Sequence, residues 1–234
     1  MKPFLYRLQD CRLPYLLILL SFSFLLQAQQ KHPITNRNIA DVMGFGGAPW
    51  LERSEREAEE APEKALDAIG IQPGMIIADV GCGTGYFTRR MAKRTGPTGK
   101  VYGVDIQPRM IESLKRNMQK EGIANVEAVL SKADDPMLPA AAIDLILMVD
   151  VYHEFATPQT MLRKMRESLK PAGRMVLLEY RKEDPNVPIR FEHKMTVEEA
   201  KAEIEAEGFR LDKVISTLPR QHILVFVPAN RRVQ

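Results

Sequence analysis

The chain contains 234 residues, of which 45% are hydrophobic and 27% are charged. These fractions are typical of a soluble globular protein and exclude a fibrous or largely disordered one. The length suits a single α/β domain with a short extension. The formal net charge is only +3, and no basic stripe follows the first thirty residues. We therefore do not expect nucleic acid as a partner.

Residues 1–30 have the pattern of a secretory signal. Three basic residues come first, Leu13 to Leu26 form an almost unbroken apolar run, and the small residue Ala28 follows. The run of about 14 residues is shorter than the roughly 20 that cross a bilayer as a helix. The pattern predicts an exported, periplasmic protein with a signal peptide. The alternative is an uncleaved anchor in the inner membrane, which would give the protein a membrane contact.

Residues 31–70 are expected to form a helical extension ahead of the main domain. A glycine-rich turn at residues 44–47 precedes a highly charged helical stretch at 49–60, and Pro62 begins a second helix that ends at Gly70. This extension, with Trp50 near its middle, is a candidate lid over a ligand. The alternative is a charged helix that is merely solvated.

Apolar and amphipathic stretches alternate from residue 75 onward. Strands are predicted at 75–80, 100–104, 126–130, 143–149, 174–180, 211–216 and 223–227, and helices at 86–94, 108–121, 157–169 and 196–208. Five strand–helix alternations imply parallel pairing with right-handed crossovers. The last two strands lie too close for an intervening helix, so they should pair antiparallel. The prediction is a Rossmann-like α/β fold: a mostly parallel seven-stranded sheet with a final antiparallel strand and helices on both faces.

The first strand runs directly into a glycine-rich loop, because residues 79–85 read DVGCGTG. Glycine permits positive φ and a close approach of backbone to a ligand. The helix that follows presents unpaired N–H groups at its start. The third glycine comes one residue earlier than in the dinucleotide pattern, which argues against a nicotinamide oxidoreductase. A tighter loop headed by Asp79 favours a ligand with a cationic amine and no phosphate.

Acidic residues also follow the next three strands. Asp105 lies twenty residues after Gly85, where a carboxylate can accept hydrogen bonds from both ribose hydroxyls. Asp134, or Asp135 in its place, follows the third strand, where it could accept from an adenine amino group. Asp150 ends the fourth strand and is a further expected contact with the cofactor.

With these features the sequence resembles the class I S-adenosylmethionine (SAM)-dependent methyltransferases over roughly residues 75–228. It is most similar to the small-molecule branch that includes the ubiquinone and menaquinone C-methyltransferases. The resemblance implies a SAM-dependent methyltransferase domain at residues 71–234. It also implies that the loop holds the methionine part of SAM, that Asp105 holds the ribose and that Asp134 holds adenine. The loop residues concerned are Asp79, Gly81, Gly83 and Gly85.

The segment after the fourth strand is expected to face the methyl acceptor. Enzymes that methylate exocyclic amines of bases usually show a Pro-Pro pair there, and this chain has none. An unperturbed histidine side chain has a pKa near ~6.5 and can take a proton at neutral pH, which draws attention to His153. We therefore predict His153 and Glu154 as catalytic residues acting on a small molecule. The alternative is a histidine that only hydrogen-bonds backbone.

Three histidines are expected at one edge of the sheet, because the last strand begins where the fourth and fifth strands end. The predicted substrate pocket comprises Tyr152, Arg181, Glu183, His193 and His222. Two histidines and a carboxylate could hold a divalent metal. The spacing along the chain is not that of a metal motif, so we predict a polar pocket without a metal.

Methyl transfer from SAM to a small-molecule acceptor is the predicted function. The alternative is a non-catalytic SAM- or nucleoside-binding module at the cell envelope.

Overall fold

The computed structural model describes residues 30–229, so nearly all of the predicted leader lies outside the described part, and export stays a prediction. Short helices come first: η1 (Phe45–Gly47), α1 (Ala48–Leu51), α2 (Arg56–Glu60) and α3 (Pro62–Ile69). The alternating part comprises β1 (Ile76–Val80), α4 (Tyr86–Thr95), β2 (Lys100–Asp105), α5 (Pro108–Lys120), β3 (Val126–Leu130), β4 (Ile143–Val149), η2 (Tyr152–Glu154), α6 (Pro158–Ser168) and β5 (Leu169–Tyr180). The chain continues with η3 (Phe191–His193), α7 (Val197–Glu205), β6 (Phe209–Ile215) and β7 (Gln221–Pro228). No helix within residues 30–229 is long and apolar enough to cross a membrane.

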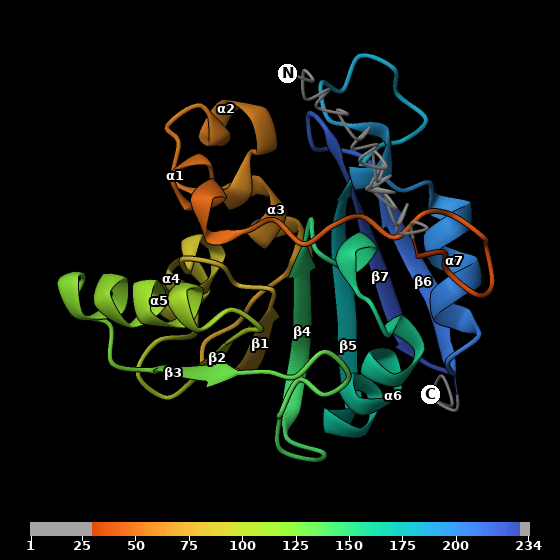
Figure 1. Ribbon diagram of the computed structural model, residues 1–234. Helices are drawn as coiled ribbons and strands as arrows, with labels where there is room; N and C mark the ends of the chain where they lie inside the picture. Colours follow the sequence, from red (N-terminus) through yellow and green to blue (C-terminus); the bar gives the residue numbers. More distant parts are fainter. Residues whose placement is uncertain (1–29, 230–234) are drawn as a thin grey trace, which may run out of the picture.

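The strands form one seven-stranded sheet in the order β3-β2-β1-β4-β5-β7-β6 (Figure 1). The five strands from β3 to β5 pair in parallel. Strand β7 runs antiparallel to both of its neighbours, β5 and β6. The predicted fold is therefore confirmed. The reversed strand is the last in sequence, but it lies inside the sheet, with β6 at the edge.

Helices cover both faces of the sheet because its central strands are apolar on both sides. Ile146 and Met148 of β4 pack in one core cluster with residues of α6 and α7. Leu145 and Leu147 of the same strand pack in a second cluster with residues of α3 and α4. This alternation follows from the two-residue period of a strand. A parallel strand buried on both faces reads as a continuous apolar run, as β4 does.

The extension at residues 31–70 differs from the expected pair of helices. The predicted helix at 49–60 is divided into α1 and α2, and Arg53, which lies between them, contacts both helices. The guanidinium of Arg53 lies 3.6 Å from the ring centroid of Trp50, and it forms ion pairs with two glutamates of α2. Leu66 of α3 is fully buried in the core. Helix α3 is thus an integral part of the layer that covers the sheet.

A buried ion pair fastens the start of the extension to α7. Arg37 donates from Nε and Nη2 to the carboxylate of Glu203, at 2.8 and 2.9 Å. Its Nη1 donates to the backbone oxygen of His153 at 3.1 Å. From this anchor the chain crosses the carboxyl edge of the sheet towards α1 (Figure 1). Arg37 therefore sets the path of the segment that covers this edge.

We predict that Arg37→Ala lowers the free energy of unfolding by about 3–5 kcal/mol, because it leaves the fully buried Glu203 without its main partner. Urea denaturation of the variant and the parent measures the difference. Lys201→Ala is the control, since Lys201 pairs with Glu205 on the exposed face of the same helix and such pairs add little stability. Equal effects of the two substitutions would contradict this account.

Candidate active site

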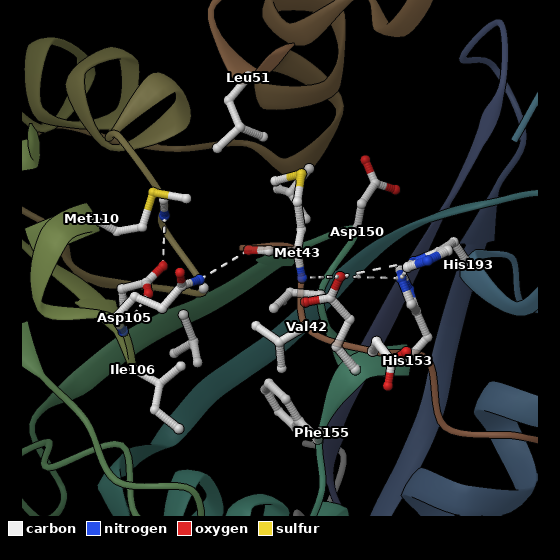
Figure 2. A pocket seen from close by; sticks show the side chains of 18 of the residues that line it. Val42, Met43, Leu51, Asp105, Ile106, Met110, Asp150, His153, Phe155 and His193 are labelled. Carbon is white, nitrogen blue, oxygen red and sulfur yellow. Dashed lines mark hydrogen bonds and ion pairs between the residues drawn. The ribbon is translucent and has the colours of Figure 1, made fainter. Parts of the chain in front are cut away.

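A cavity of about 690 Å³ opens at the carboxyl ends of the parallel strands. One wall is formed by the glycine loop after β1 and by the residues that end β2. A second wall comes from the segment after β4 and the loop before η3, and residues of the extension line the outer side of the cavity (Figure 2). Its lining includes Val42, Met43, Leu51, Arg56, Gly81, Gly83, Asp105, Ile106, Met110, Asp150, His153, Glu154, Phe155, Ile189 and His193.

The glycine loop adopts a conformation that only glycine tolerates easily. Gly81, Gly83 and Gly85 have φ angles of +77°, +55° and +91°, in the left-handed region. A Cβ atom at Gly81 would collide with the side chain of Val151. The loop is also tied to the end of β2, because the amide of Gly83 donates to Oδ2 of Asp105 at 2.9 Å. The backbone is thus held close to the cavity, although Gly85 itself does not line it.

Asp79 lies buried at the end of β1, beneath this loop. Its Oδ2 accepts a hydrogen bond from Oγ1 of Thr88 at 2.5 Å. Burial raises the pKa of Asp79 to about 7 in spite of that bond. Asp79 lines a side cavity of about 30 Å³ together with Gly81 and Arg56. Arg56 lines both cavities, so the inner end is bordered by an acidic and a basic residue.

Asp105 ends β2 with its carboxylate directed into the cavity (Figure 2). Its two oxygens accept hydrogen bonds from the amides of Gly83 and Gln107, at 2.9 and 2.8 Å. Burial raises the pKa of this carboxyl group. Each carboxylate oxygen can accept more than one hydrogen bond, so both can still bind a ligand hydroxyl.

The acids predicted to hold adenine lie elsewhere. Asp134 is exposed and does not line the cavity, and neither does Asp135. Oδ1 of Asp135 accepts from the amide of Met137 at 2.7 Å, which caps a local turn. Their neighbours Lys132 and Ala133 do line the cavity. The loop therefore borders the cavity while its two acidic side chains do not, because the direction of a loop side chain is not encoded in strand spacing.

His153 occupies a buried position at the opposite end of the cavity, with 2% of its surface exposed. Its Nδ1 lies 2.7 Å from Oε2 of Glu179, which is fully buried on β5. The other ring nitrogen, Nε2, lies 3.1 Å from Nδ1 of His193 (Figure 2). A carboxylate on one nitrogen fixes the orientation of an imidazole ring. Glu179 therefore turns Nε2 of His153 towards the cavity.

Glu154 completes this group of polar side chains. Its Oε1 lies 4.0 Å from Nε2 of His153 and 3.8 Å from Nδ1 of His193. Burial raises the pKa of Glu154 to about 7. Burial lowers the pKa of His193, and the electrostatic effect of the neighbouring His153 lowers it further. The predicted residues His153, Glu154 and His193 are thus brought together at one point.

Asp150 stands between the two ends of the cavity with an unusual backbone, since its φ angle is +50°. Its Oδ2 accepts from Nε2 of Gln221 at 2.7 Å, whereas Oδ1 is buried and has no hydrogen-bond partner among the described residues. Burial, together with the charges of Glu60 and Glu179, raises its pKa well above the usual range. A ligand that donates a hydrogen bond would satisfy Oδ1.

Four residues of the predicted substrate pocket do not line the cavity: Tyr152, Arg181, Glu183 and His222. Tyr152 is fully buried, and the guanidinium of Arg37 lies 5.6 Å from the centroid of its ring. Arg181 donates to the backbone oxygens of Leu218, in the loop before β7, and Gln221, the first residue of β7. His222 pairs with Glu183 at 3.0 Å. Successive residues of a strand face opposite sides, so Gln221, and not His222, reaches Asp150.

Sequence reasoning missed Glu179, Gln221 and Arg56. A signal existed for Glu179, because it is an acidic residue in the otherwise apolar run MVLLEY at 175–180. Acidic residues are almost never fully buried unless they are paired. A carboxylate near the end of a central strand therefore indicates a polar partner close by. For Glu179 this partner is His153.

Comparison with known proteins places these features among methyltransferases. Residues 71–220 match the family model described as "Methyltransferase domain". A ubiquinone/menaquinone biosynthesis C-methyltransferase from Hydrogenovibrio crunogenus is 31% identical over 143 residues, which cover 61% of this chain and 52% of that protein. Its counterpart from Ectopseudomonas mendocina is 27% identical over 179 residues, 67% of this chain and 68% of that protein. The chain thus spans about half of the first relative and two thirds of the second.

A solved structure shows the same architecture. The crystal structure of a SAM-dependent methyltransferase from Aquifex aeolicus superposes with a TM-score of 0.75 at 26% sequence identity. The match covers 79% of this chain and 98% of that one. Most of the described chain therefore follows the fold of that structure.

We predict that Gly81→Ala destabilises the protein by about 1–3 kcal/mol more than Gly70→Ala, because its methyl group overpacks against Val151. Both glycines have a positive φ, but a Cβ at Gly70 would meet nothing within 4 Å. Both substitutions strain the backbone in the same way. The difference between their free energies of unfolding therefore measures the collision with Val151 alone. Urea denaturation measures it, and equal midpoints for both variants would refute a tightly packed loop.

Proposed function

The chain belongs to the methyltransferase-domain family, and on this premise we propose that it is a SAM-dependent methyltransferase that methylates a small molecule bound beside SAM in the same cavity. One observation carries the proposal. The cavity that begins at Gly81 and Asp105 continues past Asp150 to His153 and His193 without leaving the carboxyl edge of the sheet. One continuous space thus offers a place for both the donor and the acceptor.

SAM would lie with its methionine part against the glycine loop. Its cationic amine suits the carboxyl group of Asp79, and its carboxylate suits the guanidinium of Arg56, because these groups line the same inner end. The ribose hydroxyls would donate to Asp105. The adenine ring would pack against the apolar side chains of Ile106 and Met110, which line the wall next to Asp105 (Figure 2).

The acceptor would occupy the end of the cavity that holds His153. Apolar side chains, among them Val42, Phe155 and Ile189, surround this end, while His153 and Glu154 supply polar atoms. Such a site fits a flat, largely apolar molecule that carries oxygen atoms at one end. The named activity of the quinone-pathway relatives supports a ring-bearing acceptor of this kind.

His153 and Glu154 are the proposed catalytic residues, because their polar atoms face the acceptor. The positive charge on the sulfonium of SAM disappears as the methyl group moves. Rate enhancement therefore depends on holding the acceptor atom, methyl carbon and sulfur in line. Glu179 would act as a positioning residue, since it fixes the ring of His153 without facing the acceptor. A protein that only binds SAM would not need these polar side chains at the acceptor end of the cavity.

The extension would cover both ligands as a lid. The backbone oxygen of Met43 accepts a hydrogen bond from Nε2 of Gln107 at 3.0 Å. The backbone amide of Met43 donates to Oε1 of Glu154 at 3.3 Å. Met43 therefore bridges the cofactor side and the acceptor side of the cavity (Figure 2). Val42, Leu51 and Arg56 of the extension also line the cavity. A cover of this kind would exclude water during transfer.

We predict that Asp105→Ala weakens SAM binding by about 1–3 kcal/mol, or roughly 5- to 150-fold, because the ribose hydroxyls lose their acceptor. Titration calorimetry of the full chain with SAM measures this change. Asp134→Ala is the matched control and should bind SAM like the parent, since Asp134 does not line the cavity. Unchanged affinity of the Asp105 variant, or an equal loss in the control, would overturn the placement of the ribose.

We predict that the full chain forms S-adenosylhomocysteine from SAM only when a suitable acceptor is added, and that hydroxylated aromatic and quinol compounds are suitable. His153→Ala should lower kcat on the order of 100-fold through loss of alignment, while the SAM affinity stays unchanged. Mass spectrometry of the methylated product and calorimetry supply the two readouts. A protein that binds SAM but methylates no member of a broad acceptor panel would favour the non-catalytic alternative.

A further inference from the structure

Three side chains at the acceptor end of the cavity direct their donor atoms towards one point. Nε2 of His153, Nδ1 of His193 and Oε1 of Glu154 are separated by 3.1, 3.8 and 4.0 Å. Figure 2 shows the two imidazole rings converging beside the cavity. We propose that these three residues bind a divalent transition-metal ion. The binding site stands on this geometry and does not depend on the proposed acceptor.

The distances between the donor atoms suit a single ion. Zinc lies about 2.0–2.2 Å from imidazole nitrogen and carboxylate oxygen. Two donors that share an ion can therefore be up to about 4 Å apart, and all three separations fall within that limit. One ion can contact all three groups with small side-chain movements. The hydrogen bond between the two histidines would be replaced by the two bonds to the metal.

The types of the ligands restrict the ion. Two imidazoles and one carboxylate suit zinc, iron(II), manganese(II) or cobalt(II), and they do not suit calcium or magnesium, which prefer oxygen ligands. Three protein ligands leave further coordination positions open. His153, Glu154 and His193 all line the cavity, so the open positions face the space proposed for the acceptor.

The surroundings of His153 match those of a metal ligand. Histidines that bind metals almost always donate their second ring N–H to a carboxylate or carbonyl oxygen. Nδ1 of His153 has this partner in Oε2 of Glu179, at 2.7 Å. The backbone amide of Tyr152 donates to the other oxygen of Glu179 at 3.1 Å, which holds that carboxylate in place. The lone pair of Nε2 is thereby directed at the ion.

A dication would also compensate the negative charge of this region. Glu154 and Glu179 are both buried or nearly so, with 10% and 0% of their side chains exposed. Buried carboxylates are usually paired with a positive charge or coordinate a metal. Their partners among the described residues are histidine rings and backbone amides, and these partners include no lysine or arginine. The ion would supply the missing positive charge.

The ion would restrict the class of acceptor, and this step rests on the proposed function. A metal with open positions next to the methyl group of SAM would hold an acceptor through its oxygen atoms. Two adjacent oxygens, as in a catechol, an enediol or a hydroxyquinone, would bind it in a defined orientation. Acceptors with adjacent oxygens should therefore be better substrates than analogues in which one of them is removed.

The test uses the untagged full chain after treatment with a chelator. Cobalt(II) is titrated into the protein, and visible absorption of the bound ion reports its coordination, with zinc as the competitor. We expect one tightly bound ion per chain. His193→Ala and Glu154→Gln should each abolish stoichiometric binding. Glu179→Gln should weaken it about 10- to 100-fold, as expected for a residue that supports a ligand.

His222→Ala is the matched control. Nε2 of His222 lies 3.0 Å from a carboxylate oxygen of Glu183, outside the cavity, so its loss should not change metal binding. The proposal is overturned if the parent binds no stoichiometric cobalt or zinc. It is also overturned if the His193 and Glu154 variants bind as the parent does, or if the control loses as much as they do.

Calorimetry with SAM on the same samples separates this proposal from the proposed function and checks that each variant is folded. We expect the His193 variant to keep the SAM affinity of the parent, because His193 lies at the acceptor end. Protein that binds SAM and methylates an acceptor, but binds no stoichiometric cobalt or zinc, refutes the metal site alone. Protein that binds the ion but no SAM refutes the proposed function alone.

Discussion

The parallel pairing of β1 with β4 is the constraint on which the site depends. The chain runs outward from β1 through β2 to β3, and it then returns to the other side of β1 to form β4. The connections after β1 and β4 therefore leave in opposite directions, which opens a crevice at the carboxyl ends of the strands. The pairing of Val80 with Met148 keeps these two ends level. The glycine loop and Asp150 thus face each other across one space.

Carboxyl groups concentrate at this edge, although the strands that carry them are apolar. Asp79, Asp150 and Glu179 lie at or next to the ends of β1, β4 and β5, and their hydrogen-bond partners are a hydroxyl, a side-chain amide, a backbone amide and a histidine ring. Burying a carboxylate in this way is costly without full compensation. Conflicts of this kind between local chemistry and stability are expected at functional sites. The cost is consistent with ligands that bring positive charge and hydrogen-bond donors to this edge.

The sequence was sufficient to predict the strands, the order of strand and helix, and the glycine loop, because these follow from periodicity and from the conformational freedom of glycine. It also predicted that His153 and His193 meet, since both follow neighbouring parallel strands. It did not predict that His222 and Arg181 turn away from the cavity, because side-chain direction depends on register and on partners distant in sequence. It also did not predict the division of the helix at 49–60, where Arg53 contacts Trp50 of α1 and pairs with Glu59 and Glu60 of α2.

The central claim is that one cavity joins the SAM site to the side chains of His153 and His193. A crystal structure of the full chain with S-adenosylhomocysteine tests it most directly. The account predicts the ribose on Asp105, the methionine part against residues 81–85, and the sulfur atom facing the open space before His153. A ligand bound elsewhere, or a sulfur atom separated from His153 by protein, would contradict it.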